Sequence, residues 1–233
     1  MRGGKAFILF VLGTSIVMAI GAQAVSTLDD AARLVRLNRF TEAMVAIKSS
    51  LATGKEKPSR VLSDVAFQPL QVDSSQRAEV RKILAQNVIE NELTMVFPNE
   101  PGIKLRVEGK VVSQQDGAPK AGVIVYLYQT DAKGIYALIR GEDVGSRNPR
   151  LFCFVKTDSA GKFSVNTIVP ASYPETTEPR HIHWEIHQIG RQGAFLFDDD
   201  PVLTPALRVK EAKYLQKVSE VKGVKVIAPV IKI

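Results

Sequence analysis

The sequence is poor in the residues that carry covalent cross-links and imidazole chemistry. It holds one cysteine and three histidines in 233 residues, so an internal disulfide is excluded. Cys153 lies in the apolar stretch at residues 151–155 and is predicted to be a small core residue rather than a nucleophile. All three histidines fall within residues 179–187, PRHIHWEIH, so any imidazole chemistry is concentrated in one segment.

Dense runs of basic residues are also missing. The formal net charge is +7 at pH 7, but Lys and Arg are scattered and no tract interleaves them with aromatic residues. We therefore expect no nucleic-acid partner, and interpret the charge as solvated surface with a mild preference for anionic small molecules. Hydrophobic residues make up 45% of the chain, which is enough for a substantial core.

The apolar run at residues 6–20 is too short for a comfortable membrane span. It follows a short basic start and precedes Ala22-Gln23-Ala24, small residues of the kind found before a signal-peptidase cut. This three-part pattern predicts a signal peptide over residues 1–24 and a mature protein that is periplasmic or secreted. No membrane span is expected after cleavage.

Residues 25–97 carry helical patterns. Thr27 or Asp29 can cap a first helix, Thr41 can begin a second, and Asp73 can cap a later one. The first two helices resemble one hairpin of a tetratricopeptide repeat, and a single copy cannot bury its own apolar face. We expect this hairpin to pack on the rest of the domain or to serve as a small docking surface.

From residue 98 to residue 233 the pattern changes to short strands. They are separated by Gly, Pro and Asp turns without helical patterns between them, which predicts a mainly β fold: an antiparallel β-sandwich preceded by the N-terminal helical segment. Tyr126 and Tyr128 are interpreted as ordinary sandwich residues. The expected strands lie at residues 105–112, 123–130, 151–169 (strand, turn, strand), 181–189 and 193–197, with an edge strand in the tail at 221–233.

The histidine segment alternates as a strand does. His181, His183, Glu185 and His187 are expected on one face, while the residues between them are mainly apolar and suit a core. A strand that holds two imidazoles about 7 Å apart is a good beginning for a metal site. By itself His-x-His is a weak signal, and a plain polar strand face is the alternative.

Two tyrosines that precede the histidine segment in the sequence lie in motifs that bear on its function. Tyr136 follows a strand and a glycine turn, and Tyr173 lies in a Pro-bounded loop eight residues before His181. With the motifs around them, residues 105–201 resemble the intradiol ring-cleavage dioxygenases, the family of catechol and protocatechuate dioxygenases. The motifs that carry the resemblance are Tyr128-Gln129, Tyr136, Thr157-Asp158 with Gly161, Thr167-Ile168-Val169-Pro170, Tyr173-Pro174 and Pro179-Arg180-His181-Ile182-His183.

The resemblance implies a mononuclear, non-haem Fe3+ centre with Tyr136, Tyr173, His181 and His183 as ligands. A hard ferric ion favours anionic oxygen donors, and a bound ion can convert tyrosine, whose pKa is ordinarily about 10, to phenolate. The family cleaves a small aromatic diol between its hydroxyl carbons with O2, without an organic cofactor. The substrate displaces one tyrosine, a catalytic role assigned here to Tyr173. N-terminal helices in the family also imply a homodimer.

Two positions depart from the family pattern. The family usually has Arg three residues before the first ligand histidine, where this chain has Glu178, and a Gln where this chain has Ala194, with Gln192 nearby. Arg180 is a candidate catalytic residue, although alternation points it away from the metal unless the strand begins only at His181. The alternative function is a non-catalytic, transthyretin-like binding module, or an envelope protein that binds catecholates or iron without cleavage.

Overall fold

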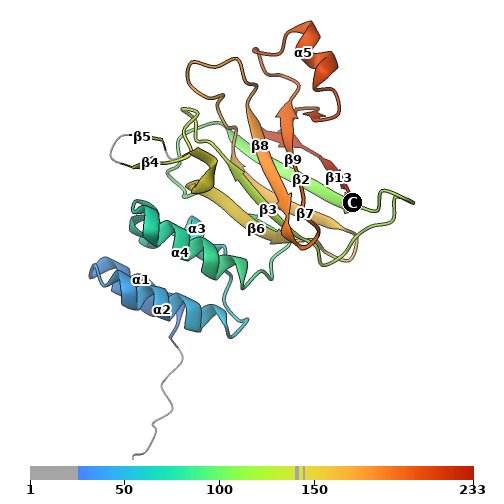
Figure 1. Ribbon diagram of the computed structural model, residues 1–233. Coiled ribbons are helices and arrows are strands. Elements are labelled where there is room, and N and C mark those ends of the chain that lie inside the picture. Colours follow the sequence, from blue (N-terminus) through green and yellow to red (C-terminus); the bar gives the residue numbers. More distant parts are fainter. Residues whose placement is uncertain (1–25, 140–141, 144) are drawn as a thin grey trace, which may run out of the picture.

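The computed structural model describes residues 26–139, 142–143 and 145–233 (Figure 1). The predicted signal peptide, residues 1–24, lies outside these ranges. Helices come first and strands follow, in the order that the sequence predicts. Within the described residues, none of the helices has the length and apolar character needed to cross a membrane.

The N-terminal helices begin where side chains can cap them. The helices are α1 (Leu28–Arg36), α2 (Phe40–Leu51), α3 (Arg60–Ser63), the 3-10 helix η1 (Val65–Gln71) and α4 (Ser74–Ala85). Thr27 caps α1 through a reciprocal pair of hydrogen bonds with Asp30, which confirms one of the two candidates. Asp73 caps α4 as predicted, by accepting hydrogen bonds from two backbone amides of its first turn. The second helix starts at Phe40, one residue before the predicted Thr41.

Two sheets make up the β region. One has the strand order β1-β7-β2-β12-β11, with β13 also paired to β2, and the other has the order β10-β9-β8-β3-β6. A small ribbon, β4-β5, stands apart. The strands are β1 (Glu92–Thr94), β2 (Lys104–Val112), β3 (Ile124–Gln129), β4 (Leu138–Ile139), β5 (Glu142–Asp143), β6 (Leu151–Lys156), β7 (Lys162–Ile168), β8 (His181–Ile186), β9 (Arg191–Phe197), β10 (Leu215–Gln216), β11 (Ser219–Val221), β12 (Val224–Ile227) and β13 (Val230–Lys232). Between them lie η2 (Gly145–Arg147), η3 (His187–Ile189) and the helix α5 (Pro205–Lys210). The prediction of no helix between the strands was wrong for α5, a short helix capped by the Thr204 side chain.

The central pairings are antiparallel, as predicted. They join β2 to β7, β3 to β6, β3 to β8 and β8 to β9. The strands β1, β10, β12 and β13 pair in parallel with β7, β9, β2 and β2 respectively, while the edge strand β11 pairs antiparallel with β12, so the sheets are mixed. These strands arrive from the helical segment or return along the C-terminal tail, and such long connections permit parallel pairing. The tail thus supplies the predicted edge, and β1 joins the sheet from before residue 98.

The strand–turn–strand segment at residues 151–169 is also different from a simple hairpin. Its two strands, β6 and β7, lie in different sheets, so the turn between them carries the chain across the sandwich. Cys153 is fully buried in β6, which confirms it as a core residue, and burial raises the pKa of its thiol. A buried thiol of this kind is inert.

The helical segment packs on the sandwich rather than standing free. In Figure 1, α4 lies between the α1–α2 hairpin and the strands, and one continuous apolar core contains residues of both parts. Arg77 of α4 is 1% exposed. Its guanidinium donates to the carbonyl oxygens of Gln71, at 2.5 Å, and of Asn148, at 3.0 Å, which ties η1 and α4 to the loop before β6.

Candidate metal centre

The four predicted ligands converge at one end of the second sheet. The hydroxyl oxygen of Tyr173 lies 2.6 Å from that of Tyr136, 3.0 Å from Nε2 of His181 and 3.5 Å from Nε2 of His183. The two imidazole Nε2 atoms are 2.9 Å apart. Two phenol oxygens and two imidazole nitrogens, from three separate segments, therefore meet at one point.

Strand β8 positions both histidines on one face. His183 lies opposite Tyr128 of β3 and Ala194 of β9, and its ring stacks on Tyr128 with centroids 4.7 Å apart. Nδ1 of His181 lies 2.7 Å from the carbonyl oxygen of Pro179. A carbonyl can only accept, so Nδ1 carries the hydrogen and Nε2 presents its lone pair to the centre, as a metal-binding histidine requires.

Burial sets the charge of the groups around the centre. It lowers the pKa of His183 to about 4, and the neighbouring His181 adds to this effect, so His183 is neutral at pH 7 with a lone pair to offer. Burial and the carboxylate of Glu185 raise the pKa of Tyr128, whose hydroxyl donates to that carboxylate at 2.9 Å. Tyr128 therefore stays a phenol beside the cluster.

Asp131 organises the Tyr136 loop, residues 130–137. Its side chain accepts hydrogen bonds from the backbone amides of Lys133, at 2.8 Å, and Ile135, at 3.1 Å. Its backbone carbonyl accepts from the amide of Gly134 at 3.1 Å. This local turn directs the side chain of Tyr136, which is 4% exposed, into the cluster.

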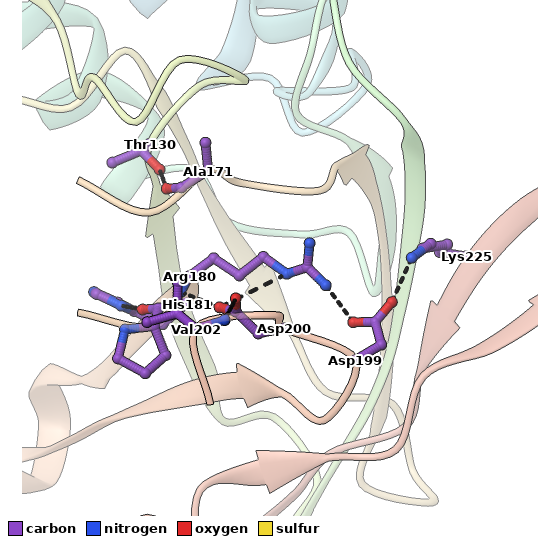
Figure 2. Close-up of polar contacts among 9 residues, drawn as sticks. Thr130, Ala171, Arg180, His181, Asp199, Asp200, Val202 and Lys225 are labelled. Atoms are coloured by element: carbon purple, nitrogen blue, oxygen red, sulfur yellow. Dashed lines mark hydrogen bonds and ion pairs between the residues drawn. The ribbon is translucent and has the colours of Figure 1, made fainter. Parts of the chain in front are cut away.

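The Tyr173 loop, residues 169–180, lies directly against the Tyr136 loop. The hydroxyl of Thr130 donates to the carbonyl of Ala171 at 2.7 Å (Figure 2), and the amide of Ala171 donates to the carbonyl of Asp131 at 3.1 Å. Gly134 has φ of +80°, and a Cβ there would lie 2.0 Å from the carbonyl oxygen of Ser172. Only glycine permits this approach.

An ion pair holds the far side of the Tyr136 loop. Arg150 donates to both carboxylate oxygens of Glu100, at 2.6 and 2.7 Å, and its backbone amide donates to the carbonyl of Tyr136 at 2.9 Å. Burial lowers the pKa of Arg150, but the hydrogen bonds and charge of Glu100 outweigh burial and leave that pKa raised. The Glu100 side chain is 5% exposed, so this pair anchors Tyr136 from within the fold.

His187, the third histidine, does not belong to the cluster. The strand ends at Ile186 and His187 begins η3, so its side chain leaves the strand alternation. Its Nε2 lies 2.7 Å from Oε2 of Glu185, and the side chain is 64% exposed. PRHIHWEIH therefore contributes two histidines to the centre and one to the surface.

Arg180 also lies apart from the four ligands. The strand does begin at His181, yet the Arg180 side chain extends away from His181 and toward Asp199, which also binds Lys225 (Figure 2). Its backbone amide donates to the buried carboxylate of Asp200 at 2.7 Å. No contact of Arg180 within the described residues reaches the cluster, so its predicted catalytic role gains no support from these contacts.

A cleft of about 550 Å³ opens over the two histidines. Its lining includes both positions that depart from the family pattern, Glu178 and Ala194, together with Gln192, which faces the same way as Ala194 along β9. Helix α5 and the residues after it form a wall that the sequence did not predict as part of the site. Tyr128, interpreted from the sequence as a plain sandwich residue, lines the cleft as well.

The donor set fits a ferric ion. In the part of the chain that the structure describes, no group of three or more His, Cys, Asp or Glu residues could hold a metal. The cluster contributes two such residues, His181 and His183, and completes the set with two phenols. Phenolate oxygens suit a hard trivalent cation, and imidazole suits iron.

The fold and the site together define a class: a two-sheet β protein with a cluster of two tyrosines and two histidines beneath an open cleft. A family model described as Dioxygenase matches residues 82–195, which include all four cluster residues. Over this range, which is just under half of the chain, the sequence is similar to the dioxygenase family that the model describes.

Solved structures with similarity to this chain include three dioxygenases. The dioxygenase domain of a dioxygenase carbohydrate-binding protein fusion from Streptomyces sp. SirexAA-E is 22% identical, with a TM-score of 0.45, over 60% of this chain and 86% of that chain. An intradiol ring-cleavage dioxygenase from Tetranychus urticae is 20% identical, with a TM-score of 0.46, over 62% and 86%. Hydroxyquinol 1,2-dioxygenase from Pseudomonas putida DLL-E4 is 20% identical, with a TM-score of 0.47, over 62% and 61%. No curated protein sequence matches significantly.

Proposed function

We propose that this protein is a non-haem Fe3+ dioxygenase that cleaves a small aromatic diol between its hydroxyl carbons with O2. One observation carries the proposal: the hydroxyl oxygen of Tyr173 lies within 3.5 Å of the donor atoms of Tyr136, His181 and His183. Four hydrogen-bonding groups gathered this closely, with His183 held neutral, form a donor set ready for a cation.

Each cluster residue has a distinct part in this proposal. His181 and His183 would present neutral Nε2 atoms, while Tyr136, buried and anchored by Arg150, would be a permanent phenolate ligand. When bound, Fe3+ supplies the Lewis acidity and one-electron chemistry that allow a chelated diol to react with O2. Tyr173, on the more exposed of the two tyrosine loops, would yield its place to the substrate, and its hydroxyl oxygen would accept a proton from the diol.

The cleft supplies the binding surface for the ring. Tyr128 and Leu207 bring aromatic and apolar surface to its lining, and the stacking of Tyr128 on His183 keeps that imidazole in place. Such a surface suits a flat aromatic molecule. Gln192 is the amide side chain beside the histidines, and it can hydrogen-bond a ring hydroxyl or substituent.

The test is the iron content and visible spectrum of the purified protein, before and after catechol is added without O2. We expect equimolar iron and a tyrosinate-to-iron colour that shifts with catechol, followed by O2 uptake in air. Tyr136→Phe and His183→Ala should lose iron and keep the fold. His187→Ala, a change in the same segment but outside the cluster, is the matched control and should behave as the unchanged protein.

Two outcomes would contradict the proposal in different ways. A protein that stays colourless and iron-free after Fe3+ is supplied would refute the metal centre and favour a binding module. Iron binding with a catechol-induced colour shift but no O2 uptake would favour the alternative function, capture of catecholates without cleavage.

We also propose that the protein is exported, because residues 1–24 have the pattern of a signal peptide. Mass spectrometry of the protein recovered from the periplasm or the medium should give a mature chain that begins at Val25. A full-length chain retained in the cytoplasm would contradict export. A homodimer through the N-terminal helices stays a prediction, which the molar mass in solution would test.

A further inference from the structure

The cleft over the two histidines carries an excess of negative charge. Its lining includes three carboxylates, those of Glu178, Glu185 and Glu211, and one ammonium group, that of Lys210. Nζ of Lys210 lies 3.5 Å from Oε1 of Glu211, so this cation is already paired. The local sign is therefore opposite to the net charge of the whole chain, which is +7.

Two of these carboxylates are held in place rather than dispersed in solvent. The Glu185 side chain is 25% exposed and the Glu211 side chain 22%. Glu185 lies two residues beyond His183 on the same face of β8, and it accepts hydrogen bonds from Tyr128 and from the neighbouring His187. Charges with restricted access to water are screened less than those on an open surface, so they act on whatever enters the cleft.

Arg180, which adjoins His181 in the sequence, does not offset this charge. The guanidinium of Arg180 points away from His181 and binds Asp199 (Figure 2). An anionic ring substituent in the cleft would meet carboxylates and only the paired Lys210. A cationic substituent would meet carboxylates with free acceptor positions.

We propose that the cleft selects aromatic diols that carry a protonated amine over those that carry a carboxylate. This inference rests on the proposed function, because it concerns the substrate of the same site. Exchange of a positive for a negative substituent against this excess of carboxylates is expected to change affinity about tenfold or more at low salt. A neutral substituent gives an intermediate affinity.

A matched set of three ligands tests the proposal: dopamine, 4-ethylcatechol and 3,4-dihydroxyphenylacetate, which share one ring and differ mainly in charge. Their dissociation constants would be measured on the iron-loaded full chain, from the visible spectrum without O2. We expect dopamine to bind most tightly and 3,4-dihydroxyphenylacetate about tenfold more weakly. The gap, meaning the ratio of these two dissociation constants, should narrow as salt is raised. Glu211→Gln and Glu178→Gln should each narrow the gap, and Glu220→Gln, exposed on β11 outside the cleft, should leave it unchanged.

A second readout does not need iron. Trp184, the single tryptophan of the chain, lies between His183 and Glu185 in β8 with its ring packed on Phe195, so its fluorescence is used to follow binding of phenethylammonium and phenylacetate to the iron-free protein. Equal affinities for the amine and the carboxylate, in either assay, would overturn the charge selection. If 4-ethylcatechol shifts the spectrum, the proposed function survives that result. If no diol shifts it, the proposed function fails, and the fluorescence comparison still decides the charge selection.

Discussion

Gly134→Ala is expected to disrupt the proposed metal centre without replacing any of the four residues proposed as ligands. The added Cβ would lie 2.0 Å from the carbonyl oxygen of Ser172 and 3.1 Å from Cδ of Pro174. Since carbon and oxygen atoms normally approach to about 3.3 Å, the Tyr136 and Tyr173 loops must separate by about 1 Å. A functional constellation tolerates about 0.5 Å of displacement, so the two phenols would no longer meet the two imidazoles.

The magnitude follows from two contributions. A non-glycine residue at φ of +80° costs about 1–2 kcal/mol, and relief of the backbone contact adds about 1–3 kcal/mol. Gly117→Ala is the matched control, because Gly117 has φ of +73° and nothing within 4 Å of an added Cβ. It bears only the first cost, and about 2–4 °C of Tm is lost per kcal/mol for a chain of this size.

Thermal unfolding and Fe3+ titration of both variants decide the question. Gly117→Ala should lose a few degrees of Tm and bind iron normally, while Gly134→Ala should lose about twice as much Tm and at least tenfold in iron affinity. If the two variants match in Tm and in iron affinity, then the loops can separate freely and the account of how they position the tyrosines is wrong.

Three further predictions concern the frame around the centre. Glu100→Gln removes the closer of the two carboxylates that pair with the Arg150 guanidinium and leaves Asp131 at 3.7 Å. Chemical denaturation should show a loss of about 2–4 kcal/mol in the free energy of unfolding; a loss under about 0.5 kcal/mol would contradict the anchoring role. The pKa of His183 in the folded state, about 4, lies below its ordinary value of 6.5, so the unfolded state binds more protons and the stability of the iron-free protein should fall as pH drops through this window. His183→Gln should reduce this dependence of stability on pH relative to the unchanged protein. Identical pH dependence in the two proteins would refute the burial argument. Arg77→Met leaves the carbonyl of Asn148 without its hydrogen-bond donor, so limited proteolysis should release the helical segment sooner while iron content is retained. If the variant loses iron as well as resistance to proteolysis, then Arg77 also supports the proposed metal centre.

The four cluster residues could be predicted because the motifs around them are local and together resemble those of a known family. Alternation along β8 fixes the common face of His181 and His183, and a glycine turn and a proline-flanked loop mark Tyr136 and Tyr173. The longer strands were predictable because each carries its own periodicity, whereas the two- and three-residue strands β1, β4, β5 and β10 are too short to show one. Their parallel outer pairings were not, since a pairing partner far along the chain leaves no trace in local periodicity.

The surroundings of the ligands depend on contacts between distant segments. The Arg180 side chain turns toward Asp199 and Asp200, and these two carboxylates approach it only in the folded chain. The place of Tyr128 beside the centre depends on its register with His183 across two strands. The excess of carboxylates in the cleft likewise depends on folding, because Glu211 joins Glu178 and Glu185 there only through the position of helix α5. The overall positive charge of the chain gave no indication of it.

Strand β8 carries the core residues on one face and the proposed metal-binding residues on the other. Ile182 and Ile186 face the core, each 1% exposed, while His181 and His183 face the opposite side. Replacement of either histidine leaves the apolar face of the strand intact, and a changed core residue leaves the donor atoms in register. Descendants of such a chain can abandon the metal and survive as folded binding proteins. Equally, an engineer can exchange the two histidines for other donors and reuse the same scaffold for a different ion.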